Sequence, residues 1–303
     1  PSGPISMGAA RVLSGGDLRF GTATIPEFSA RTIAEVRDWI DPQLKSGPVE
    51  LSVVGDTTWE EASAQVGATL GALPQRAERS NATSSQILSP PQKPSKNVYL
   101  ATTDPILRQV AIAEFCPVKD LSGVHMERRC RLLAAILAER MRVRLRVELG
   151  AAYGFDADFV EIDGFPDFSY FIATATVSPE HAKRASELVL SEIEALRHGR
   201  FTDDEFERVK RPFLSSREED LRNNGYWGST VLRDAQQRPE RLDAARDRQA
   251  DCASIRRSEV EALASRYFGA KHWFHFVAYP RAGSMYLPVL RPVAGPAGLP
   301  SFH

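Results

Sequence analysis

The segment 128–155 constrains the fold most, because a long helical pattern ends inside it and an extended pattern begins. Its apolar residues recur every three or four positions, a spacing that places them on one buried face of a helix. These residues are Leu132, Leu133, Ile136, Leu137 and Met141. Gly150 suits the left-handed position that ends many helices. We therefore predict a helix over 119–149 and a strand over 151–162.

Basic residues gather at the end of the predicted helix, where a positive charge also suits the helix dipole. Arg146 stands seven residues before Tyr153, across the glycine break. A guanidinium and a phenol that lie close together could both donate hydrogen bonds to a carbonyl or carboxylate of a bound peptide. The plainer interpretation is a solvated arginine and a half-buried strand tyrosine. Local chemistry by itself favours the plainer interpretation.

Composition excludes several classes of protein. The 303 residues are 43% hydrophobic and 25% charged with a net charge of −1, so no overall field points to nucleic acid or to an anionic membrane. The apolar runs are far shorter than the roughly 20 residues that span a bilayer. Three scattered cysteines argue against a disulfide scaffold and leave the compartment open. No secretory signal pattern opens the chain; residues 1–16 are predicted to be a flexible lead.

Strand and helix patterns alternate along the rest of the chain. Strands are expected over 49–54, 97–102, 108–117, 168–177 and 273–279. Helices begin at two capping boxes, Thr58-x-x-Glu61 and Thr202-x-x-Glu205. Strand pairs interspersed with helices predict an α+β fold, with a mainly antiparallel sheet packed on one face by helices. A Pro- and Gly-rich tail is expected over 281–303.

A search for catalytic motifs finds few candidates. The chain has no G-x-S-x-G turn, no phosphate-binding loop and no His-x-x-Glu-His or inverse motif. His272-x-x-His275 comes nearest to metal-ligand spacing, but residues three apart on a strand point to opposite faces. No histidine lies beside the cysteines in sequence. By its residues alone, the chain lacks the parts of a hydrolase site and no catalytic or metal-binding residue is assigned.

Several motifs in order resemble one peptidase family. The run from Leu145 to Tyr153, LRVELGAAY, is similar to the signature LREELGxAY of the pitrilysin/insulinase family of zinc metallopeptidases, the inverzincins. Further similar segments are Val53-Val54-Gly55-Asp56, Leu70–Pro74, Gly199–Lys210 and Asn224–Trp227. The resemblance covers roughly residues 17–280. It is to the non-zinc, C-terminal type of domain, and most of all to large periplasmic bacterial members.

The resemblance implies a ferredoxin-like elaboration of the α+β fold, as in the homologous domains of that family. It places an inactive peptidase domain over 48–280, with 17–47 as the end of a preceding domain or a linker helix. It assigns substrate binding to Arg146 and Tyr153 and to no other residue. The zinc would then belong to a partner domain or subunit, and this chain would bind no cofactor of its own.

The implied function is that of a substrate-binding, non-catalytic domain of a zinc metalloendopeptidase. The expected partners are the zinc-bearing half and a peptide, without nucleic acid or membrane, in the periplasm or alternatively the cytoplasm. A structural or assembly subunit on the same fold is the alternative. It would have no need of both Arg146 and Tyr153.

Overall fold

The computed structural model describes most of the chain, which divides into two units. The described residues are 1–76, 96–121, 123–150, 154–162, 165, 168–236, 238–269, 273–281 and 291–293. Unit 1 comprises Pro1–Ile25, Pro90–Phe213 and Ile255–His303, and unit 2 comprises Pro26–Ser89 and Leu214–Ser254. The inactive peptidase domain predicted over 48–280 stays a prediction.

Unit 1 is built on a six-stranded sheet in the order β3-β4-β2-β5-β1-β6. The strands are β1 (Val98–Thr103), β2 (Val110–Val118), β3 (Gly154–Val160), β4 (Ser169–Val177), β5 (Phe274–Pro280) and β6 (Arg291–Val293). Neighbouring strands are antiparallel except for β1 and β5, which run parallel. The mainly antiparallel sheet is confirmed.

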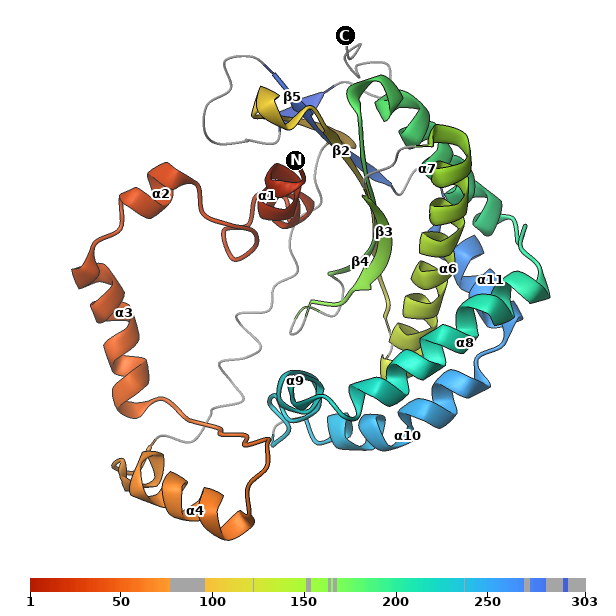
Figure 1. Cartoon of the computed structure of the whole chain (residues 1–303). Helices are drawn as coiled ribbons and strands as arrows, with labels where there is room; N and C mark the ends of the chain where they lie inside the picture. The colour runs from red at the N-terminus through yellow and green to blue at the C-terminus, as the bar shows by residue number, and fades with distance from the viewer. Residues whose placement is uncertain are drawn as a thin grey trace. The chain divides into compact units, whose positions relative to one another are not determined.

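Three helices cover one face of this sheet: α6 (Gly123–Leu149), α7 (Ala182–Arg197) and α11 (Arg257–Tyr267). Figure 1 shows α6 running alongside β3 and β4. The predicted apolar face of α6 is confirmed, because Leu132, Leu133 and Leu137 are completely buried. They join Phe159 and Phe171 in the main hydrophobic core. Burial of these side chains is the main force that fixes α6 on the sheet.

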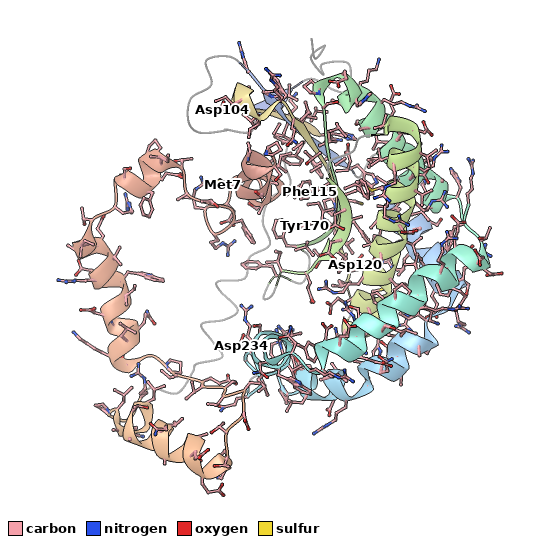
Figure 2. The ribbon with its side chains drawn as sticks, viewed as in Figure 1. Met7, Asp104, Phe115, Asp120, Tyr170 and Asp234 are labelled. Carbon is pink, nitrogen blue, oxygen red and sulfur yellow. The ribbon has the colours of Figure 1, made fainter. Side chains whose placement is uncertain are left out.

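The opposite face of the sheet is covered by α1 (Gly3–Leu13), within the segment predicted to be a flexible lead. Ile5, Ala9 and Leu13 recur at helical spacing and are 3–5% exposed. They share a second core with Phe115 and Phe276 of the sheet and with Phe168, which directly precedes β4. Figure 2 labels Phe115 and Tyr170 on this face, and Met7 on α1. The short stripe of apolar residues, with a proline in the first turn, explains why this lead is helical.

The remaining helices do not form the layer on the sheet. They are α2 (Ile25–Ser29), α3 (Ile33–Ser46), α4 (Trp59–Ala68), α8 (Asp203–Asp220), α9 (Asn224–Tyr226), a π-helical turn η4 (Trp227–Val231) and α10 (Glu240–Ser254). Of these, α8 begins in unit 1 and ends in unit 2. Short 3₁₀ turns lie at η1 (Leu70–Ala72), η2 (Pro105–Leu107) and η3 (Pro179–His181). No helix in the described part of the chain has the length and apolar character needed to cross a bilayer.

The strand predicted over 49–54 is wrong for this structure, since the segment is extended but pairs with no described strand. Its polar side chains bond other residues of unit 2 instead. Glu50 accepts a hydrogen bond from the backbone N–H of Gln236, and Ser52 donates one to the carbonyl of Leu232. Val49, Leu51 and Val53 are exposed. The β-forming pattern is present, but a strand also requires a neighbour.

The predicted capping box at Thr202 is confirmed. The side-chain oxygen of Thr202 accepts from the N–H of Glu205 at 3.1 Å, and the Glu205 carboxylate accepts from the N–H of Thr202 at 2.9 Å. We expect Thr202→Ala to lower the free energy of unfolding by about 1 kcal/mol, since one N–H at the start of α8 loses its partner. Thr202→Ser keeps the hydroxyl and should lose much less in urea denaturation.

Candidate functional site

The candidate site lies where α6 ends and β3 begins. Gly150 has a φ of 64°, in the left-handed region that favours glycine, and its N–H donates to the carbonyl of Arg146. The buried face of α6 continues to this end through Met141, Leu145 and Leu149. That face anchors the last turns of the helix. The side chains between the anchors therefore point outward.

Two of the three arginines near this end are committed to ion pairs. Arg142 bonds both oxygens of Glu139, at 2.7 Å and 2.6 Å. Arg144 lies 3.1 Å from Glu148 and 3.0 Å from Glu192. Arg146 is exposed, and no described residue forms an ion pair or side-chain hydrogen bond with it. Its five donors are thus available to a ligand.

Two exposed valines lie near Arg146 on α6, Val143 about one turn before it and Val147 directly after it. Val143 is 42% exposed and Val147 is 77% exposed, and they stand one helical turn apart. A helix surface in water would ordinarily place polar residues at such positions. The combination of an unpaired guanidinium with apolar side chains offers a hydrogen-bond donor beside a surface for aliphatic groups. Peptides present both kinds of partner.

Tyr153, the second residue predicted for substrate binding, lies outside the described residues, as do the two alanines before it. The structure therefore places Arg146 but does not give the distance between the two side chains. Gly154, the first residue of β3, is exposed and paired with Thr176 of β4. The chain thus returns to the sheet directly after Tyr153.

A second pair of titratable groups, a buried glutamate and a half-buried histidine, was not predicted from the sequence. Glu114 of β2 and His275 of β5 stand opposite each other in register, and the ring Nδ1 of His275 hydrogen bonds Glu114. Glu114 is 1% exposed, and its Oε1 has no partner in the described structure. Burial disfavours a charged ring, but the hydrogen bond and the charge of Glu114 outweigh it and raise the pKa of His275. A charged residue inside an apolar strand pattern was the available signal.

The cysteines are not candidates for nucleophiles. All three are buried and free. Burial raises the pKa of the Cys130 thiol to about 12 and that of Cys116 further still. A thiol with a raised pKa is protonated near neutral pH and unreactive.

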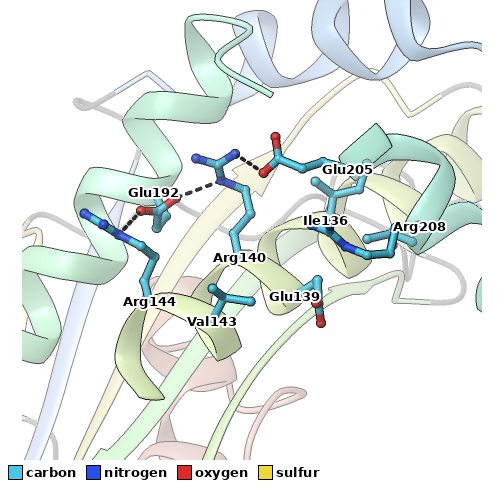
Figure 3. A pocket seen from close by; sticks show the side chains of 9 residues that line it. Ile136, Glu139, Arg140, Val143, Arg144, Glu192, Glu205 and Arg208 are labelled. Atoms are coloured by element: carbon cyan, nitrogen blue, oxygen red, sulfur yellow. Dashed lines mark hydrogen bonds and ion pairs between the residues drawn. The ribbon is translucent and has the colours of Figure 1, made fainter. Parts of the chain in front are cut away.

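A small pocket of about 100 Å³ lies between α6, α7 and α8 (Figure 3). Arg140 spans it, lying 2.7 Å from Glu192 and 2.9 Å from Glu205. Ile136, Val143 and Val209 supply its apolar lining. Since the arginine is bonded to carboxylates on α7 and α8, we interpret this site as a structural ion network that joins three helices.

Metal binding finds no support in the described residues, where no three His, Cys, Asp or Glu side chains are grouped as ligands. His275 is engaged with Glu114. The other histidine of the sequence pair, His272, lies outside the described residues. The donor set in the described part of the chain therefore does not fit a zinc ion.

Comparison with known sequences matches residues 31–213 to the family described as "Peptidase M16 inactive domain". This match spans more than half of the chain. Among curated proteins, none matches the chain significantly.

Solved structures share the fold at low identity. A protease from Helicobacter pylori has a TM-score of 0.69 at 15% identity, covering 85% of this chain and 62% of its own. A peptidase M16 inactive domain from Pseudomonas fluorescens has a TM-score of 0.64 at 16% identity, covering 93% and 66%. The ferredoxin protease FusC in complex with Arabidopsis ferredoxin has a TM-score of 0.64 at 13% identity, covering 92% and 30%. The chain thus spans less than two thirds of the H. pylori protein.

Proposed function

Because this chain belongs to the M16 peptidase family and carries its inactive domain, we propose that it is the substrate-binding, non-catalytic part of a zinc metalloendopeptidase. The zinc-bearing part would be another domain or another subunit. The partner would supply the chemistry of the zinc-activated water. This chain would hold the peptide.

The observation that supports this proposal is the unpaired guanidinium of Arg146. Its neighbours Arg142 and Arg144 have carboxylate partners, whereas Arg146 has none in the described structure. An arginine that stabilised the fold would be expected to have such a partner. A planar fork of N–H donors held at a helix end suits a peptide carbonyl or carboxylate.

In the proposed role, Arg146 and Tyr153 act on the peptide backbone. Arg146 N–H groups and the Tyr153 hydroxyl would donate hydrogen bonds to a peptide carbonyl oxygen near the bond that is cleaved. Donors fixed in advance stabilise negative charge as it develops on such an oxygen. Val143 and Val147 would meet aliphatic parts of the peptide. No step of this role requires a metal ligand from this chain.

The test is carried out in the complete enzyme, with the zinc-bearing part present. We expect Tyr153→Phe and Arg146→Gln each to reduce kcat/KM by about 100- to 1,000-fold, the usual loss when one such donor is removed. Zinc content should stay unchanged. The matched control is Arg142→Gln. Arg142 lies near the same helix end but is paired with Glu139, so this variant should retain turnover.

Wild-type turnover by both Tyr153→Phe and Arg146→Gln would rule out this role. That result would favour the alternative, a structural or assembly subunit of the same fold. The isolated chain with added zinc should show no peptidase activity. Activity of the isolated chain would contradict the assignment of zinc to a partner.

We also propose the periplasm as the compartment, on the resemblance of the Asn224–Trp227 segment to large periplasmic members. Fractionation of cells that produce the full-length protein tests this. Recovery with cytoplasmic markers would exclude it.

A further inference from the structure

β3 is the terminal strand of the described sheet, with β4 as its neighbour on one side and an open edge on the other. Such an edge presents unpaired N–H and carbonyl groups to any extended polypeptide. The sequence of β3, GFDADFV, alternates apolar and acidic residues. Without its aspartates it would be a short, flat, apolar strand of the kind that associates readily.

The two aspartates of β3 bond the backbone of their own strand. The N–H of Ala157 donates to Oδ1 of Asp156 at 2.9 Å, and the N–H of Phe159 donates to Oδ1 of Asp158 at 2.7 Å. N–H groups two residues apart on a strand point to the same side. The N–H groups of the residues between these positions then point to the other side of β3, toward β4. The N–H groups of Ala157 and Phe159, which the aspartates cap, are therefore those of the open edge.

A contact from α6 supports this placement. The side chains of Ala157 and Phe159 join the core beneath α6, so Asp156 and Asp158 start on the other face. Yet Arg131 of α6 lies 3.7 Å from Oδ1 of Asp158. An arginine from the helical face can reach that oxygen only around the rim of the sheet. The Asp158 carboxylate thus lies at the edge of β3.

We propose that Asp156 and Asp158 close the open edge of β3 against strand addition. Their carboxylates occupy the N–H groups that an incoming strand would need. Their charges also repel the carbonyl oxygens of such a strand. The extended strand most available to test this is β3 of a second copy of the chain.

The proposal predicts a pattern of amide hydrogen exchange in the unaltered protein. Phe155 is an internal control, because its N–H points to the same side but follows Gly154, which has no side chain to cap it. The amides of Ala157 and Phe159 should exchange about tenfold more slowly than that of Phe155, the effect of one hydrogen bond to a charged group. Equal exchange at the three amides would overturn the proposal.

Two double variants separate the effect of the capping hydrogen bonds from the effect of the negative charges. In Asp156→Ala/Asp158→Ala the amides of Ala157 and Phe159 should exchange about tenfold faster, and the protein should self-associate with rising concentration in sedimentation velocity. Asp156→Asn/Asp158→Asn keeps an acceptor oxygen at both positions and should keep the slow exchange. An alanine variant that stays as monodisperse as the wild type, or exchanges as slowly, would refute the closure. The unfolding midpoint of each variant confirms that it is folded.

Discussion

Replacing His275 with alanine is expected to lower the free energy of unfolding by about 3–5 kcal/mol, the usual cost of leaving one member of a buried ion pair unpaired. Glu114 is 1% exposed and would lose the ring that bonds it. Its second oxygen already has no partner in the described structure, so no other group is in place to compensate. Urea denaturation of wild type and variant measures the difference.

A double variant provides the control for this prediction. In Glu114→Leu/His275→Ala the buried charge is gone, so the double variant should be more stable than His275→Ala by itself. Equal stability of the single and double variants would show that the unpaired carboxylate is not the cause of the loss.

The same pair makes stability depend on pH in a defined direction. The folded pKa of His275 is raised above its ordinary value of 6.5, so the unfolded chain gives up this proton at lower pH than the folded one. The stabilising charge is therefore fully present below about pH 6.5 and is lost as pH rises through the folded pKa. His275→Gln, which cannot titrate, should lack this part of the pH dependence. Identical pH profiles would contradict the assignment.

The second large effect is expected at Arg140. Replacing Arg140 with methionine should cost about 3 kcal/mol in the free energy of unfolding, because Glu192 is 4% exposed and would keep, among the described residues, only Arg144 as an ion-pair partner. Glu205 at the start of α8 would lose the same arginine. Thermal or urea unfolding of the whole chain is the measurement.

The matched control for Arg140 is Arg142→Met on the same helix. Arg142 pairs with Glu139 at the surface, where its side chain is 44% exposed, so its loss should cost less than about 1 kcal/mol. If the two variants were equally stable, the ion network between α6, α7 and α8 would contribute no more to the free energy of unfolding than the surface pair of Arg142 and Glu139.

Local patterns predicted the elements of unit 1 well. The helix expected over 119–149 is α6, which ends at the predicted residue and begins four residues later than predicted. The strands expected over 108–117 and 168–177 are β2 and β4, within one or two residues. All three predictions rest on short-range periodicity, which a sequence displays directly. The capping box at Thr202 is similarly local, with donor and acceptor three residues apart.

Features that depend on distant residues were not predicted. Glu114 and His275 are 161 residues apart and meet only because β2 and β5 are neighbours. The docking of α1 depends on its contacts with β1 and β5, which lie far from it in the sequence. In the candidate site, the exposed position of Arg146 follows from the apolar pattern of α6. That Arg146 has no ion-pair partner among the described residues, whereas Arg142 and Arg144 have carboxylate partners, is visible only in the folded structure.

The position of β5 has a consequence for how the chain is made. This strand, near the C-terminal end of the chain, lies between β2 and β1, and β1 contacts the rest of the sheet through it. During synthesis, β1 is made before β5 and has no place in the sheet until β5 has left the ribosome. Its apolar side chains must wait until the long segment between the two strands has been made, and pairings with such high sequence separation form slowly. The sheet of unit 1 therefore cannot be completed before β5 is available.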